Sequence, residues 1–131
     1  METMQVKSNG RVQFIDITAR IRETISKSGV RDGMAVIFVP HTTAGITINE
    51  AADPAVVEDI KEKLAKLAPY SDAYRHAEGN SDAHIKASLL GSSVMVIIAD
   101  GAPVLGTWQG IFFCDFDGPR TRKLFVQIIP S

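Results

Sequence analysis

The spacing of hydrophobic positions along the chain predicts about seven short strands separated by turns. Short blocks rich in β-branched and other apolar residues are typical of strands. They cover residues 4–7, 11–15, 34–39, 45–49, 94–99, 107–113 and 124–129. Ser8-Asn9-Gly10 lies between the first two blocks and predicts that they pair as a hairpin.

A helix is predicted most clearly over residues 53–67. Asp53 can cap its first turn and Pro54 suits the first helical position. Acidic residues also stand four positions before basic ones on the polar side, which stabilises a helix. The apolar stripe consists of Val56, Val57, Ile60, Leu64 and Leu67.

The order of the predicted elements favours an α+β fold. Two further helices are expected: one capped by Asp16 that ends at Gly29, and a short one over residues 82–90. Strands and helices do not alternate as βαβ units, which favours a mixed or mostly antiparallel sheet over a doubly wound one. We expect one domain over residues 1–131, with helix 53–67 packed on the sheet and the edge strands covered or paired between subunits.

Composition and charge narrow the class of protein. The 131 residues are 45% hydrophobic and 22% charged, which excludes a disordered chain. A net charge of −1 argues against a nucleic-acid or membrane-surface binder. The longest apolar run, residues 94–99, is far shorter than a membrane span, and the N-terminus lacks the pattern of a secretory signal. With a single cysteine, a cytoplasmic location is expected.

Common catalytic and cofactor-binding motifs are absent from the sequence. It contains no G-x-G-x-x-G, Walker loop, H-E-x-x-H or G-x-S-x-G. Cys114 has aromatic neighbours, which predicts a buried, inert thiol rather than a nucleophile. Asp115-Phe116-Asp117-Gly118 resembles the start of a calcium loop but lacks the later ligands, so we interpret it as a turn.

The three histidines lie in polar segments and are the most informative residues. His41 follows the end of a buried strand, whereas His76 and His84 are eight positions apart with Glu78 and Asp82 between them. Three neutral imidazoles can hold Zn²⁺ and leave one position open for water or substrate. Alternatively, each histidine is an ordinary surface or hydrogen-bonded residue, and spacing alone favours that interpretation.

Two glycine-containing motifs are open to two interpretations each. Gly106-Thr107-Trp108-Gln109-Gly110 places glycines on both sides of a tryptophan, which suggests close approach by a ligand or another chain. Alternatively, Trp108 fills the core. Asp117-Gly118-Pro119-Arg120 predicts a turn whose arginine either holds a phosphate or carboxylate or is simply solvated.

Several motifs, taken in order, resemble those of the YjbQ-like family. They span nearly the whole chain, and the G-T-W-Q and D-A-H motifs together are specific. The segments are Pro40-His41-Thr42-Thr43-Ala44, Ile46-Thr47-Ile48-Asn49-Glu50, Asp53-Pro54, His76, Gly79-Asn80-Ser81-Asp82-Ala83-His84, Lys86-Ala87-Ser88-Leu89-Leu90-Gly91, Gly106-Thr107-Trp108-Gln109-Gly110 and Phe116-Asp117-Gly118-Pro119-Arg120. The chain is identified as a member of this family.

The resemblance implies a jelly-roll-like, mostly antiparallel α+β protein that assembles as a homotrimer. It also implies secondary thiamine-phosphate synthase activity, which joins hydroxymethylpyrimidine diphosphate to thiazole phosphate and releases diphosphate. The matched polar positions of the family fall on His41, His76, Asp82, His84, Thr107 and Gln109.

We therefore expect one cleft near a subunit boundary in which the histidines converge. His41, His76 and His84 are the expected metal ligands, and catalytic roles are assigned to His41, Asp82, His84 and Gln109. The expected substrate contacts are Thr43, Asn49, Lys86, Thr107, Trp108 and Arg120.

Three functions remain open from the sequence. A synthase would bind a small phosphorylated molecule, with Asp82, Glu50 or Glu78 serving Mg²⁺ and Lys86 and Arg120 serving phosphate. A metal-dependent hydrolase or lyase would use the three histidines and zinc, with Asp82 or Glu78 as base. The third is a module that binds a metal or small molecule without catalysis.

Overall fold

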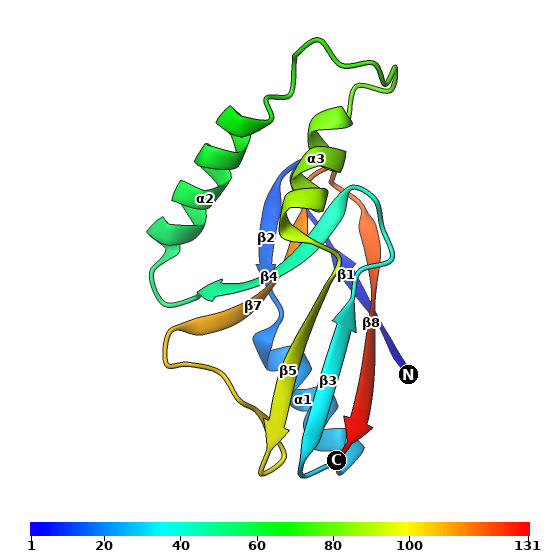
Figure 1. Cartoon of the computed structure of the whole chain (residues 1–131), viewed down its shortest axis with the longest axis vertical. Coiled ribbons are helices and arrows are strands. Elements are labelled where there is room, and N and C mark those ends of the chain that lie inside the picture. The colour runs from blue at the N-terminus through cyan, green and yellow to red at the C-terminus, as the bar shows by residue number, and fades with distance from the viewer.

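Eight strands and three helices follow one another in the computed structural model, which describes residues 1–131 (Figure 1). In chain order they are β1 (Glu2–Lys7), β2 (Gln13–Asp16), α1 (Thr18–Ser28), β3 (Gly33–Phe38), β4 (Ala44–Glu50), α2 (Pro54–Leu67), α3 (Ser81–Leu90), β5 (Ser93–Ala99), β6 (Ala102–Pro103), β7 (Gln109–Asp115) and β8 (Thr121–Pro130). The sequence predicted all of these except the two-residue β6, with differences of up to three residues at the ends.

The strands form two antiparallel sheets. The larger has the order β1-β8-β3-β5-β6, and the smaller has the order β2-β7-β4. Figure 1 shows α2 and α3 together at one end of the molecule, whereas α1 lies toward the other end. The α+β class and the antiparallel pairing are therefore confirmed.

The predicted hairpin between the first two strands is wrong. β1 pairs with β8 and β2 pairs with β7, so the two strands belong to different sheets. The turn between them instead contacts a distant segment, because the Ser8 amide donates to the Arg120 carbonyl and the Gly118 amide donates to the Arg11 carbonyl. A turn signal reports local geometry only, and here these long-range contacts decide the pairing.

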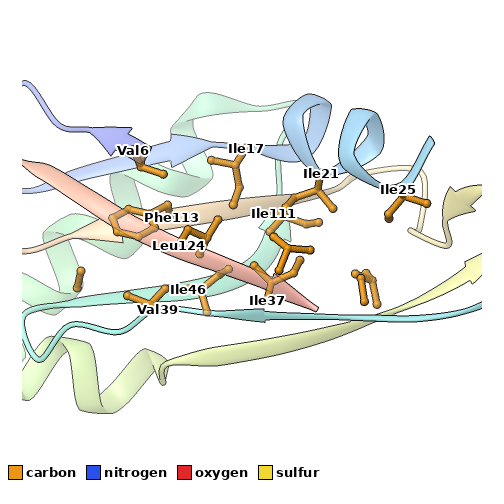
Figure 2. Packing of buried hydrophobic residues seen from close by; sticks show 14 of the residues in the cluster. Val6, Ile17, Ile21, Ile25, Ile37, Val39, Ile46, Ile111, Phe113 and Leu124 are labelled. Atoms are coloured by element: carbon orange, nitrogen blue, oxygen red, sulfur yellow. The ribbon is translucent and has the colours of Figure 1, made fainter. Parts of the chain in front are cut away.

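Two hydrophobic clusters hold the sheets and helices together. In the larger one, α1 contributes Ile17, Ile21 and Ile25, which are spaced four apart and fully buried (Figure 2). The smaller cluster consists of Leu64, Ala83, Ala87, Phe112, Cys114 and Phe116. Successive residues of β7 point to opposite clusters, which is why this strand is buried on both faces.

Local capping residues explain where the helices begin and end. The Asp53 carboxylate accepts a hydrogen bond from the Ala55 amide at 3.0 Å, as predicted for the N-cap of α2. For α1 the capping position is Ile17 rather than Asp16, although the Asp16 carboxylate still accepts from the Thr18 amide at 2.9 Å. Gly29 ends α1 in the left-handed conformation, with φ of 75°.

The outer face of the larger sheet is apolar and uncovered. Its cross-strand rows carry no charged side chain, and Phe38 stacks on Phe125 with ring centroids 6.4 Å apart. The rows are Ile97-Met34-Ile129, Met95-Val36-Gln127 and Ser93-Phe38-Phe125. Met95 and Ile97 are each 66% exposed. No helix of the chain is both long and apolar enough to cross a membrane.

Candidate functional site

His41 and His84 line one polar cavity of about 410 Å³ at the end of the molecule that carries α3. His41 lies in the loop between β3 and β4, and His84 lies in the first half of α3. We name this hollow the arginine cavity; it is lined by Pro40, His41, Thr42, Thr43, Glu78, Asn80, His84, Asp117, Arg120 and Arg122. A neighbouring hollow of about 490 Å³ is also lined by both histidines.

The approach of α3 to β4 brings the two histidines together. The Ile46 amide donates to the Gly91 carbonyl at 3.1 Å, just past the end of α3. A β-carbon at Gly45 would lie only 2.9 Å from that carbonyl oxygen, so a glycine is needed for this close contact. The sequence of β4 therefore fixes the position of the helix that carries His84.

His41 is held as a neutral hydrogen-bond donor. Its Nε2 accepts a hydrogen bond from the Lys123 amide at 2.9 Å, so the neutral ring carries its proton on Nδ1. Burial lowers the pKa of His41 below its usual value, and the nearby Arg122 guanidinium lowers it further. At neutral pH the ring can therefore donate one hydrogen bond through Nδ1 without carrying charge.

Arg122 is a buried cation at the wall of the arginine cavity. Its side chain is 3% exposed, and it donates to both Asp115 carboxylate oxygens, at 3.1 and 2.8 Å, and to Thr43 Oγ1 at 2.8 Å. Nη1 donates no hydrogen bond within the chain. Arg122 is thus held rigidly and keeps one nitrogen free for a ligand.

The carboxylate behind Arg122 is ionised. Burial acts to raise the pKa of Asp115, but hydrogen bonds from Arg122, the Asp117 amide and Ser8 outweigh it and hold this pKa below its usual value. Ser8 donates to Asp115 at 2.7 Å and accepts from the Arg120 amide at 3.0 Å. The same network therefore positions Arg122 and the turn that carries Arg120.

Arg120 lies on this turn and reaches the cavity from its exposed side. It donates to Asp117 Oδ2 at 3.0 Å, and Asn80 Nδ2 donates to the same oxygen at 2.9 Å. This contact fixes the Asn80 amide orientation and leaves its Oδ1 buried without a partner. The predicted turn is confirmed, and Arg120 lies where an anionic ligand of the cavity would bind.

His76 lies on the other side of His84. The two rings are perpendicular with centroids 5.4 Å apart, and together they line a second cavity of about 470 Å³. His76 Nε2 lies 3.7 Å from Glu78 Oε2. His84 is thus shared between the two cavities, whereas His41 and His76 line different ones.

The residues present do not fit the expected three-histidine metal centre. No three His, Cys, Asp or Glu side chains are grouped so that they could hold a metal ion. In addition, Nε2 of His41 already accepts the Lys123 amide and its Nδ1 carries the proton. We therefore derive no chemical step through a metal.

Asp82 and Lys86 are buried and paired with each other. The Asp82 carboxylate is fully buried, receives two hydrogen bonds of 2.9 Å from Arg11 and lies 3.0 Å from the Lys86 ammonium. Although burial acts to raise the pKa of Asp82, the hydrogen bonds from Arg11 and Lys86 outweigh it and lower this pKa. Neither residue lines the arginine cavity; Lys86 instead lines a hollow of about 310 Å³ beside Leu64.

The G-T-W-Q segment lies at the opposite end of β7 from the histidines. Asp115 pairs with Ala44 at the histidine end, whereas Gln109 pairs with Glu50 and Gly110 with Asn49 at the other. Six residues of strand separate these ends by about 20 Å. Trp108, next to Thr107, is 64% exposed, so it does not fill the core. Within one chain, Asn49, Glu50, Thr107, Trp108 and Gln109 do not join the histidines.

Sequence reasoning missed Arg122, Asp115 and Asn80 as parts of the site. A signal for Arg122 was available, because it alternates in phase with the buried Leu124 and Val126 of β8. A charged residue in a core-facing position needs a buried partner. The partner, Asp115, was assigned to a turn, although it is the last residue of β7.

The two-sheet fold and the cavity between its loops define a small α+β protein with a polar, histidine-containing ligand site. A sequence model described as "UPF0047 protein YjbQ-like" matches residues 2–131. The chain belongs to the YjbQ-like UPF0047 family, as its motifs predicted.

Relatives from bacteria and archaea resemble the chain over nearly its full length. A UPF0047 protein of Methanocaldococcus jannaschii is 60% identical over 125 residues, covering 95% of this chain and 91% of that protein. The UPF0047 protein YugU of Bacillus subtilis is 45% identical over 130 residues, covering 98% of each. A crystal structure of an uncharacterised YjbQ/UPF0047 protein from Clostridium acetobutylicum superposes with a TM-score of 0.96 at 57% identity, over 98% of this chain and 100% of that one. These names give no activity, so function is argued from the site.

Proposed function

We propose that the arginine cavity binds a small phosphorylated molecule and that the protein acts on it as a thiamine-phosphate synthase. The observation that carries the proposal is the convergence of Arg122, Arg120 and His41 on one polar cavity with His84 opposite. Arginine donors suit phosphate oxygens, and a buried guanidinium held by its neighbours needs no reorganisation when a ligand binds.

The implied reaction needs stabilisation of a leaving diphosphate. The ring nitrogen of thiazole phosphate attacks the methylene carbon of hydroxymethylpyrimidine diphosphate. The new C–N bond forms while the C–O bond breaks, and diphosphate leaves with that electron pair. Negative charge therefore grows on the leaving oxygens, where the two arginines and the Nδ1 proton of His41 would offset it. His84 would donate a hydrogen bond or proton to the leaving group.

Product formation from the two substrates tests this proposal. We expect the wild type to form thiamine phosphate and diphosphate in equal amounts, measured by chromatography and a phosphate-release assay. His84→Ala and Arg120→Ala should each lower the rate by roughly tenfold to a thousandfold. Arg22→Ala removes an exposed arginine of α1 outside the cavity and should leave the rate unchanged.

Two results would overturn parts of the proposal. Binding of both substrates without product would support the non-catalytic module instead. If neither substrate nor inorganic phosphate binds, the arginine cavity is not a phosphate site at all.

We also propose that copies of the chain assemble as a homotrimer through the apolar outer face of the larger sheet. The three cross-strand rows of this face carry no charge, so identical faces can approach without repulsion. Contiguous exposed apolar patches of this kind are typical of protein interfaces. Burial of Met95 and Ile97 would supply part of the stabilising free energy.

A further inference from the structure

Two cavities of different chemical character meet at His84. The arginine cavity on one side has an almost entirely polar lining that includes Arg120 and Arg122. The cavity on the other side, which we name the tyrosine cavity, has a volume of about 470 Å³ and is lined by Tyr74, Arg75, His76, Ser81, His84 and Ile85. Each volume is within the range of small-molecule sites.

The walls of the tyrosine cavity suit a flat ring. Tyr74 contributes an aromatic side chain, His76 stands perpendicular to His84, and Ile85 contributes an aliphatic side chain that is 41% exposed. Aromatic and aliphatic walls bind planar rings by stacking and edge contacts. No carboxylate lines this cavity, so an electron-rich or neutral ring is not repelled.

We propose that the tyrosine cavity is a subsite for an aromatic or heteroaromatic ring and that the phosphate attached to this ring lies in the arginine cavity. This proposal rests on the proposed function, because it assumes that the arginine cavity takes the phosphate. His84 lines both cavities, so it lies beside the bond that joins ring and phosphate group. The ligand is therefore an aryl or arylmethyl phosphate, and its two ends are recognised separately.

The arrangement also assigns a distinct role to each group of residues. Arg120 and Arg122 recognise the phosphate whatever is attached to it. Ile85 and Tyr74 contact only the ring, so they determine which phosphate esters bind tightly. His84 contacts both parts, and its replacement should weaken every ester.

Calorimetric titration of the whole protein with three probes tests the subsite. The probes are inorganic phosphate, methyl phosphate and phenyl phosphate. We expect phenyl phosphate to bind roughly tenfold more tightly than methyl phosphate, because only its ring enters the tyrosine cavity. Ile85→Ser should remove most of this difference and leave the affinity for inorganic phosphate unchanged.

Leu89→Ser is the matched control for this variant. Leu89 lies one turn further along α3, is 59% exposed and lines neither cavity, so its replacement should change no affinity. Equal affinities of the wild type for methyl and phenyl phosphate would overturn the subsite while leaving the phosphate site intact. Loss of binding for all three probes would instead overturn the proposed function. If Ile85→Ser and Leu89→Ser weaken phenyl phosphate equally, the ring does not lie in the tyrosine cavity.

Discussion

Replacing Arg122 by methionine should destabilise the protein strongly, because it leaves a buried carboxylate without its cation. Asp115 is fully buried, and two of its four hydrogen bonds come from Arg122. Breaking a buried ion pair from one side costs about 3–5 kcal/mol. Since Ser8 and the Asp117 amide still donate to the carboxylate, we expect about 3 kcal/mol, at the lower end of that range.

Urea unfolding followed by circular dichroism measures this loss. A chain of this size has an m-value of about 1.5–2 kcal/mol/M, so the midpoint should fall by about 1.5–2 M. Adding Asp115→Asn to Arg122→Met should restore much of the loss, because the amide is uncharged and can still accept a hydrogen bond. A loss below about 1 kcal/mol in the single variant would refute the reasoning.

The pH dependence separates the charge effect from lost packing. In the wild type the folded pKa of Asp115 lies below its unfolded value, so its contribution is complete above the unfolded pKa and is lost as pH falls through the folded pKa. In Arg122→Met the unpaired carboxyl should have a raised pKa, so its cost is largest at neutral pH. The stability difference between the two proteins should therefore narrow as pH falls from about 7 toward 4. A constant difference would indicate packing alone.

Three further results are expected. Asp53→Ala removes the side-chain cap of α2 and should lower the free energy of unfolding by about 1 kcal/mol, whereas Asp59→Ala should change it little. An NMR titration of His41 should give a midpoint below 6.5, since burial lowers its pKa; a midpoint above that value would contradict the geometry. Light scattering should give a trimer mass that Ile97→Lys reduces to a monomer, and a monomeric wild type would refute the assembly.

Local sequence signals predicted elements well but not their long-range pairing. Asp53, Pro54 and the stripe through Leu64 defined α2 because capping and periodicity act within a few residues. The pairing of β1 with β8 depends on residues more than a hundred positions apart, which no local pattern encodes. The predicted hairpin failed for this reason.

The candidate site was predictable only in part for the same reason. His41 and His84 do share a cavity, whereas His76 lies across α3 and Trp108 lies at the far end of β7. Residue types suggested a metal, but the backbone amide of Lys123 occupies the ring nitrogen that a metal would need. Such backbone contacts form only in the folded chain.

The central place of β8 has a consequence for the order in which the molecule can be made. β8 lies between β1 and β3, and its partners Glu2 and Gly33 are synthesised long before Val126 and Pro130. On the ribosome, β3 can pair with β5 on one side while its other edge stays open. Open edges of this kind favour pairing with other nascent chains. Productive folding is therefore post-translational and starts only when residues 121–130 become available, with a nucleus of high contact order.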